Sequence, residues 1–280
     1  MRHTIDIEKI CVPISKCDCL QLGQIEIHYV ELLEKNGYSQ APVIFEKNGS
    51  VWGIIETSYA RYLCDHDKQL LIEDENISHL EIGGNPSLDV LFEKMSKAKA
   101  VLVVDELDAE EHGTQVFCSG LLTISDLNKL PLRNVLYGVI AEIEEEIAKI
   151  IAQSFNDHEI WLKRLKKDKR EKIKKNRISY KRGNVDIGPL AGCDLSTLIN
   201  IVAKSPEIWK QLEYTSRGKF EDDSGCIPDL RHKVMHPVRP LIVEGNIEKI
   251  WKTLLTIEDL GNRLSKIKEI KKVDSRYLKG

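Results

Sequence analysis

Apolar residues in the first 130 positions fall in short runs separated by polar turns, a pattern typical of strands. Residues 43–45 and 51–55 form one pair of runs, and Asn48-Gly49 between them is typical of a hairpin turn. Residues 100–106 ("AVLVVDE") and 117–124 ("FCSGLLTI") form a second pair. The loop in this second pair is expected to be about eight residues longer. The first half therefore predicts two strand hairpins.

A helical pattern precedes each hairpin, "EIHYVELLEKN" at residues 26–36 and "SLDVLFEKM" at residues 87–95. Leu33-Glu34-Lys35 in the first pattern match Phe92-Glu93-Lys94 in the second, both in spacing and in residue type. A short helical stretch follows each hairpin. The sequence thus predicts an internal repeat of about 60 residues with the order βαββα.

From residue 131 the apolar residues recur at intervals of three and four, which predicts helices. Pro131 marks the expected start of the first helix, directly after the second repeat and without a Gly/Ser linker. Further helices are expected in the basic segment 158–178, at 195–212 with a break at Ser205-Pro206, and at 246–270, whereas 183–194 and 216–228 are predicted to be loops. The second half is therefore expected to be an all-helical bundle of about four or five helices.

The apolar faces of these helices identify the expected core of the second half. Three of the expected helices carry such a face. The first contributes Val135, Leu136, Val139, Ile140, Ile143, Ile147, Ile150 and Ile151, and the basic segment contributes Ile160, Trp161, Leu165 and Ile173. The last contributes Ile247, Ile250, Trp251, Leu254, Leu255, Ile257 and Leu260.

The composition supports two domains of a globular protein. The chain has 280 residues, 42% hydrophobic and 30% charged, and we expect domains at 1–130 and 131–280. The net charge of -3 excludes a uniformly basic protein, so any nucleic-acid contact must use a local patch. Seven cysteines lack the paired spacing of a zinc site, and "MRHTIDIEKI" lacks the apolar core of a signal peptide. We therefore expect reduced thiols, a cytoplasmic location and no membrane partner, since no stretch approaches the length of a membrane span.

The most specific element of the first half is "GLLTISD", residues 120–126, at a strand-to-helix turn. A helix N-terminus offers unpaired N–H groups to a phosphate, and the hydroxyls of Thr123 and Ser125 can join them. Asp126 can accept hydrogen bonds from two ribose hydroxyls. The alternative is a purely structural role, in which Ser125 or Asp126 caps the following helix.

With this motif, the tandem repeat resembles a pair of CBS domains, a Bateman module, over about residues 8–130. The resemblance implies an α+β fold of two βαββα repeats. It also implies an adenine nucleotide (ATP, ADP or AMP) as regulatory ligand, held by Gly120, Thr123, Ser125 and Asp126. The first copy, "GIIETSY", departs from the pattern with Glu56 in place of Thr123 and Tyr59 in place of Asp126. One nucleotide site that depends on the second copy is therefore expected.

The stretch "DLRHKVMHPVRP", residues 229–240, gathers cations and two imidazoles between prolines. Arg231 and His236 form an R-x4-H motif with the polar His232 directly after the arginine. Another R-x4-H, Arg61 to His66, has the apolar Tyr62 at that position, and no function is assigned to it. The alternative for residues 229–240 is a histidine-rich helix end without a catalytic role.

This second half resembles the HEPN superfamily over about residues 132–272, helical bundles whose R-x4-6-H motif forms a ribonuclease site that requires no cofactor or metal. The resemblance implies RNA cleavage that leaves a 2′,3′-cyclic phosphate and a 5′-OH. His236 would act as general base or acid, Arg231 would stabilise the transition-state charge, and His232 would position the phosphate or assist proton transfer. Because this site is sparse and family members commonly pair their motifs, a homodimer is expected.

A basic run at residues 161–182 lies between these features. It predicts a track for an RNA backbone, and the alternative is a solvated, solubilising helix face. The predicted RNA-binding residues are Lys163, Arg164, Lys167, Arg170 and Lys174.

The sequence therefore predicts a nucleotide-regulated ribonuclease, for which the HEPN resemblance implies a toxin, defence or stress role. Two alternatives stay open. The bundle can serve non-catalytic nucleotide sensing, dimerisation and RNA docking, or it can be a toxin or accessory of a separate nucleotidyltransferase partner.

Overall fold

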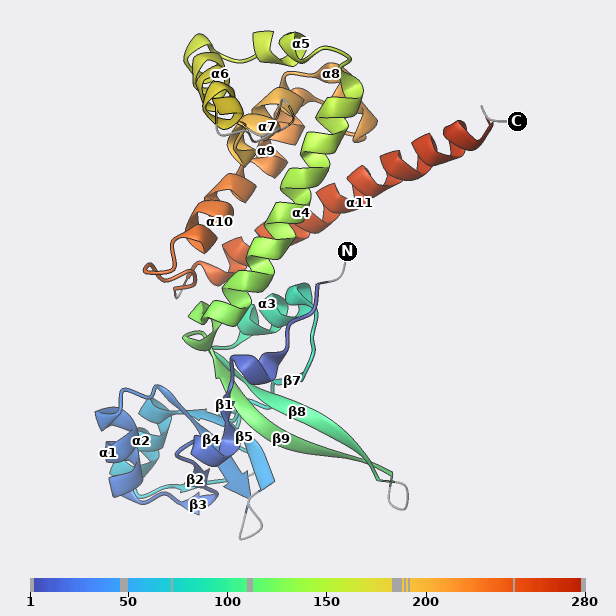
Figure 1. Ribbon diagram of the computed structural model, residues 1–280. Coiled ribbons are helices and arrows are strands. Elements are labelled where there is room, and N and C mark those ends of the chain that lie inside the picture. Colours follow the sequence, from blue (N-terminus) through green and yellow to red (C-terminus); the bar gives the residue numbers. More distant parts are fainter. Residues whose placement is uncertain are drawn as a thin grey trace. The chain divides into compact units, whose positions relative to one another are not determined.

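The computed structural model describes residues 3–45, 50–71, 73–109, 113–182, 188, 190, 192–243 and 245–277. Contacts divide the chain into two compact units, one of residues 2–135 with 240–251 and one of residues 136–239 with 252–280. The described part of the first unit contains all the strands, whereas that of the second is helical (Figure 1). The single boundary expected after residue 130 misses the return of residues 240–251 to the first unit.

The first unit contains the two predicted repeats. In each copy a short strand pairs in parallel with the first strand of an antiparallel hairpin, and a helix joins them. The first copy is β2 (Leu20–Gln21), α1 (Ile27–Lys35), β4 (Gln40–Phe45), β5 (Ser50–Glu56) and α2 (Thr57–Asp65). The second is β7 (Glu81–Gly83), α3 (Leu88–Lys97), β8 (Ala100–Ala109) and β9 (Gly113–Thr123), followed by the 3-10 turn η3 (Asp126–Asn128) and α4 (Leu130–Ser154). The βαββα order of the repeat is confirmed.

Short elements complete this unit. They are η1 (Ile7–Lys9), β1 (Val12–Pro13), η2 (Ile14–Lys16), β3 (Gly23–Gln24) and β6 (Gln69–Leu70). Strand β1 pairs with β9, which gives the sheet order β1-β9-β8-β7, and β3 pairs with β6. Leu33 of α1 and Phe92 of α3, equivalent in the repeat, are both buried, as their matched spacing predicts.

The second hairpin differs from its prediction. The residues expected to form a longer loop instead extend the ladder of β8 and β9 as far as the pair Ala109 and Gly113. Thr114 and Val116 are strand-forming residue types, and pairing satisfies the backbone groups that a loop would leave to water. The turn predicted at Asn48-Gly49 lies outside the described residues, although the hairpin of β4 and β5 is confirmed.

The second unit holds more helices than expected. Its described part contains eight, the end of α4 and then α5 (His158–Lys163), α6 (Lys167–Arg182), α7 (Leu195–Ala203), α8 (Pro206–Gln211), α9 (Arg217–Ser224), α10 (Cys226–Met235) and α11 (Ile247–Tyr277), of which α11 joins this unit at residue 252. The break predicted at Ser205-Pro206 is confirmed between α7 and α8. No described helix is both long and apolar enough to cross a membrane.

Helix α9 and the start of α10 correct the loop expected at residues 216–228. Ser216 caps α9 by accepting a hydrogen bond from the Lys219 amide at 3.1 Å, and Phe220 is fully buried. Ion pairs one turn apart join Arg217 to Glu221 and Lys219 to Asp223, each at 2.7 Å. The cap, the buried ring and these pairs outweigh the low helix propensity of the Gly and Asp residues in this stretch.

Two apolar positions were assigned to the core wrongly. The first is Ile160 in the basic segment, which is 44% exposed. This segment forms two helices, α5 and α6, with a break around the buried Leu165. Leu255 of α11 is 42% exposed. The other expected core positions of α11 that are buried are Ile247, Ile250, Leu254, Ile257 and Leu260.

Candidate functional site

A cavity of about 360 Å³ lies beside the second-repeat motif in the first unit. Strand β9 ends at Thr123, and the chain turns into η3 at Asp126, so Thr123, Ser125 and Asp126 all line this cavity. Gly120 does not line it and packs against the segment before β1 instead. Three of the four predicted nucleotide-binding residues are therefore brought to one cavity, which we call the second-repeat cavity.

Asp126 is buried and has internal partners. One carboxylate oxygen, Oδ2, accepts hydrogen bonds from the Thr123 amide and the Thr123 hydroxyl, both at 2.8 Å. The other oxygen, Oδ1, pairs with the Lys129 ammonium at 2.8 Å. A carboxylate has about four acceptor positions, so these contacts leave room for one more donor. Asp126 therefore holds its own turn as well as lining the cavity.

Other lining residues of this cavity were missed by sequence reasoning. Asn36, Tyr38 and Gln40, around the end of α1 and the start of β4, line the cavity together with Lys16 of the N-terminal segment. No local motif marks them, because they lie in the other copy of the repeat. The one signal in the sequence was the repeat itself, which implies that each copy faces the hairpin of the other.

Cys17 also lines this cavity. Burial, followed by the neighbouring thiols of Cys19 and Cys118, raises the pKa of Cys17 to about 12. The thiol therefore stays protonated at neutral pH and offers no nucleophile, which leaves the cavity suited to reversible binding.

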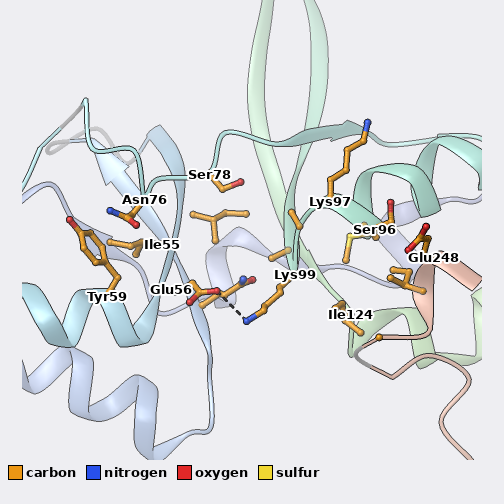
Figure 2. A pocket seen from close by; sticks show the side chains of 17 residues that line it. Ile55, Glu56, Tyr59, Asn76, Ser78, Ser96, Lys97, Lys99, Ile124 and Glu248 are labelled. Carbon is orange, nitrogen blue, oxygen red and sulfur yellow. Dashed lines mark ion pairs between the residues drawn. The ribbon is translucent and has the colours of Figure 1, made fainter. Parts of the chain in front are cut away.

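The first copy has an equivalent cavity of about 590 Å³, the first-repeat cavity (Figure 2). Glu56 and Lys99 point toward each other across it and form an ion pair at 3.2 Å. The Tyr59 hydroxyl donates to Asp74 at 2.8 Å, and burial followed by this bond raises the pKa of Tyr59. Glu56 and Tyr59 thus replace the hydroxyl and the carboxylate of the second copy with a carboxylate and a phenol.

Residues from the far end of the sequence complete this first-repeat cavity. Gly245, Ile247 and Glu248 form part of its wall, as does Ser96 of α3 (Figure 2). This contribution was not predicted, because the sequence shows no boundary that would assign these residues to the first unit.

The cationic stretch lies in the second unit on α10. Leu230 and Val234 anchor the helix in the core, while His232 and His236 are exposed. Their ring centroids are 4.3 Å apart in an edge-on arrangement. The Arg231 guanidinium pairs with Glu144 of α4 at 3.0 Å, which holds it beside the helix. Helix α10 ends at Met235, and His236 is its C-terminal cap.

The predicted RNA-binding residues have different surroundings. Arg164 pairs with Glu207 at 2.6 Å, donates to the Lys204 carbonyl at 2.9 Å and stacks over the Phe155 ring, so its guanidinium joins helices of the bundle. Lys174 pairs with Glu159 at 3.5 Å. Lys163 and Lys167 are exposed, and Arg170 is half-buried. The RNA track stays a prediction.

Within the described ranges, no group of three or more His, Cys, Asp or Glu side chains is placed to hold a metal ion.

Comparisons with known proteins add little. No family model and no curated protein matches the sequence. The structure of the CBS domain of a bacterial CNNM/CorC family Mg²⁺ transporter in complex with ATP is 19% identical, over 44% of this chain and 84% of that chain, with a TM-score of 0.34. A hemolysin-like protein containing a CBS domain from Oenococcus oeni PSU is 18% identical over 42% and 84%, with a TM-score of 0.34. A CBS domain-containing protein of unknown function from Bacillus anthracis str. Ames Ancestor is 18% identical over 45% and 91%, with a TM-score of 0.35. Likenesses this low carry no argument, so the resemblance to CBS domains rests on the repeat and its motif.

Proposed function

We propose that the first unit is a Bateman-type sensor that binds an adenine nucleotide in the second-repeat cavity. The observation that carries this proposal is the convergence of Thr123, Ser125 and Asp126 on one cavity of about 360 Å³. Ligand cavities are usually about 300–1,000 Å³, with apolar walls and a few polar groups that fix the ligand.

The lining residues suggest how such a nucleotide binds. Leu121, Pro42 and Val12 provide apolar surface for the base. The Ser125 hydroxyl and the Lys16 ammonium are donors for phosphate oxygens. Asp126 has one acceptor position left for a ribose hydroxyl, and a second position opens when Lys129 leaves the carboxylate.

Calorimetric titration with ATP, ADP and AMP tests this proposal. Ser125→Ala removes a donor to phosphate and is expected to weaken binding about tenfold. Ser58→Ala is the matched control, since Ser58 occupies the equivalent position in the first copy and does not line the second-repeat cavity. Absence of binding to the parent protein, or an equal loss in both variants, contradicts the proposal.

A second function is favoured by the end of α10. Two exposed imidazoles, with ring centroids 4.3 Å apart, lie at the end of the helix that carries Arg231, so one can act as base and the other as acid. In the proposed ribonuclease reaction, His236 takes the proton of a ribose 2′-OH, whose oxygen attacks the adjacent phosphorus. The 5′-oxygen leaves with a proton from His232, and Arg231 stabilises the charge on the phosphate oxygens. A homodimer would place two such motifs together.

Cleavage of labelled RNA in EDTA, with and without ATP, tests the second function. The parent protein should leave 2′,3′-cyclic phosphate ends, and His236→Ala should lower the rate by about a hundredfold or more. The control is His66→Ala, because His66 ends the R-x4-H of the first repeat and is exposed. Equal cleavage by parent and His236→Ala, or no cleavage under either condition, favours non-catalytic sensing and RNA docking.

A further inference from the structure

The segment between α10 and α11 is bound to the second repeat by one side chain. We call residues 240–243, 245 and 246 the connector. The Asn128 carbonyl oxygen accepts hydrogen bonds from the amides of Leu241 at 2.7 Å and Ile242 at 2.9 Å, and the Asn128 amide donates to the Ile242 carbonyl at 2.9 Å. Three hydrogen bonds thus join residues more than a hundred positions apart in the sequence.

The connector is an ordered part of the first unit. Leu241 is fully buried and Ile242 is 2% exposed. The Asn246 side chain accepts a hydrogen bond from the Val243 amide at 3.0 Å, and Gly245 turns the chain with a φ of +89°, in the region that favours glycine. Buried apolar side chains with satisfied backbone groups are typical of a structural segment rather than a loose linker.

Asn128 is also part of the motif turn. It is the last residue of η3, which begins at Asp126 and follows the Thr123 and Ser125 that line the second-repeat cavity. Its backbone amide donates to the Ser125 carbonyl at 3.1 Å. A ligand that binds Ser125 and Asp126 therefore acts on the same short turn that holds the connector.

The other end of the connector reaches the first-repeat cavity. Gly245, followed by Ile247 and Glu248 of α11, lines the first-repeat cavity, which also contains the Glu56–Lys99 ion pair. The connector is therefore held at one end by the motif turn and borders a cavity at the other.

We propose that Asn128 is a latch that transmits ligand occupancy of the second-repeat cavity to the connector, and through it to α10 and α11. The identity of the ligand rests on the proposed nucleotide-sensing function, whereas the latch rests on the Asn128 contacts. A ligand that binds the motif turn more tightly in its closed form than in its open form stabilises the closed form, and it therefore reduces opening of the latch. The coupling is reciprocal: the factor by which the ligand favours the closed latch equals the factor by which the closed latch raises ligand affinity, and loss of the latch removes that gain.

Hydrogen exchange of the full chain without ligand tests the latch itself. Asn128→Ala removes all three bonds, and the Leu241 and Ile242 amides should exchange at least about tenfold faster. Asn128→Asp keeps an acceptor for both amides but replaces the donor to the Ile242 carbonyl with an oxygen, so its exchange should lie between that of the parent and that of Asn128→Ala. Asn156→Ala is the matched control at an exposed asparagine of the second unit. Unchanged exchange in Asn128→Ala overturns the latch.

The same measurement with saturating ATP tests transmission. In the parent protein, ATP should slow exchange at residues 121–126 and at Leu241 and Ile242, and in Asn128→Ala it should slow only residues 121–126. Protection of 121–126 without any response at Leu241 and Ile242, or a response that survives in Asn128→Ala, overturns transmission. Absence of protection at 121–126 in the parent contradicts the nucleotide proposal. The exchange measured without ligand then still shows whether Asn128 holds the connector.

Discussion

At the residue scale, Gly120 and Gly53 show that a motif residue can be required for packing rather than for binding. A Cβ at Gly120 would lie 2.8 Å from the Cys11 sulfur and 2.9 Å from the Val12 carbonyl oxygen. A Cβ at Gly53, its equivalent, would meet Ile77 and lie 3.0 Å from the Ser78 carbonyl oxygen. The segment before the first copy crosses the hairpin of the second copy at Gly120, and the segment before the second copy crosses the hairpin of the first copy at Gly53, so a side chain has no room at either glycine.

Gly120→Ala is therefore expected to lower the free energy of unfolding by roughly 1–3 kcal/mol, because the Val12 backbone cannot move aside without breaking the pairing of β1 and β9. Gly138→Ala is the control. Its Cβ meets nothing within 4 Å in α4, and alanine there should raise stability by about 0.5–1 kcal/mol. Urea unfolding of both variants measures this. A Gly120→Ala variant as stable as the parent would contradict the packing role.

At the element scale, capping residues define where several helices begin. Asp194 caps α7 by accepting a hydrogen bond from the Thr197 amide at 2.7 Å. Partial burial alone would raise the pKa of Asp194, but the bonds from Thr197 and the charges of Lys169 and Lys172 on α6 outweigh it and lower the pKa. The basic helix thus has a structural role at the start of α7, besides any contact with RNA.

This lowered pKa predicts a pH dependence. Because the folded pKa lies below the ordinary value of about 3.9, the charge of Asp194 stabilises the fold above that pH and ceases to do so as the pH falls through the folded pKa. Asp194→Asn keeps a capping side chain without the charge, so its small deficit in stability at neutral pH should shrink as the pH falls below about 3.9 and through the folded pKa of Asp194. Asp194→Ala should lose about 1 kcal/mol at neutral pH. Urea midpoints across this pH range measure the effect, and a deficit of Asp194→Asn that does not change with pH would contradict it.

Prediction of elements succeeded where apolar periodicity was strong. The spacing of apolar and turn residues predicted the repeat, the break at Ser205-Pro206 and the long closing helix, and the structure contains all three. Helix α9 was missed because its polar and glycine-containing sequence has low helix propensity, and its stability comes from the buried Phe220 and from its cap. The break before α6 was missed because charge and periodicity continue through the buried Leu165.

At the scale of the whole molecule, the chain crosses between its two units three times, after residues 135, 239 and 251. The first crossing lies within α4, and the last lies within α11. The connector lies between the second and third crossings. The proposed sensor is thus joined to the second unit by several covalent routes, and the proposed Asn128 latch would act on the route nearest in sequence to Arg231 and His236.

The sequence alone determined the repeat, the helical character of the second half and the residues of the two motifs, because apolar spacing and turn residues act locally. Tertiary structure alone decided that Tyr38 and Gln40 line one cavity with Thr123 and that Glu144 holds Arg231. It also decided that Leu241 and Ile242 return to Asn128. These contacts join residues far apart in the chain, and burial and hydrogen bonding in the folded state select them without leaving a periodic pattern in the sequence.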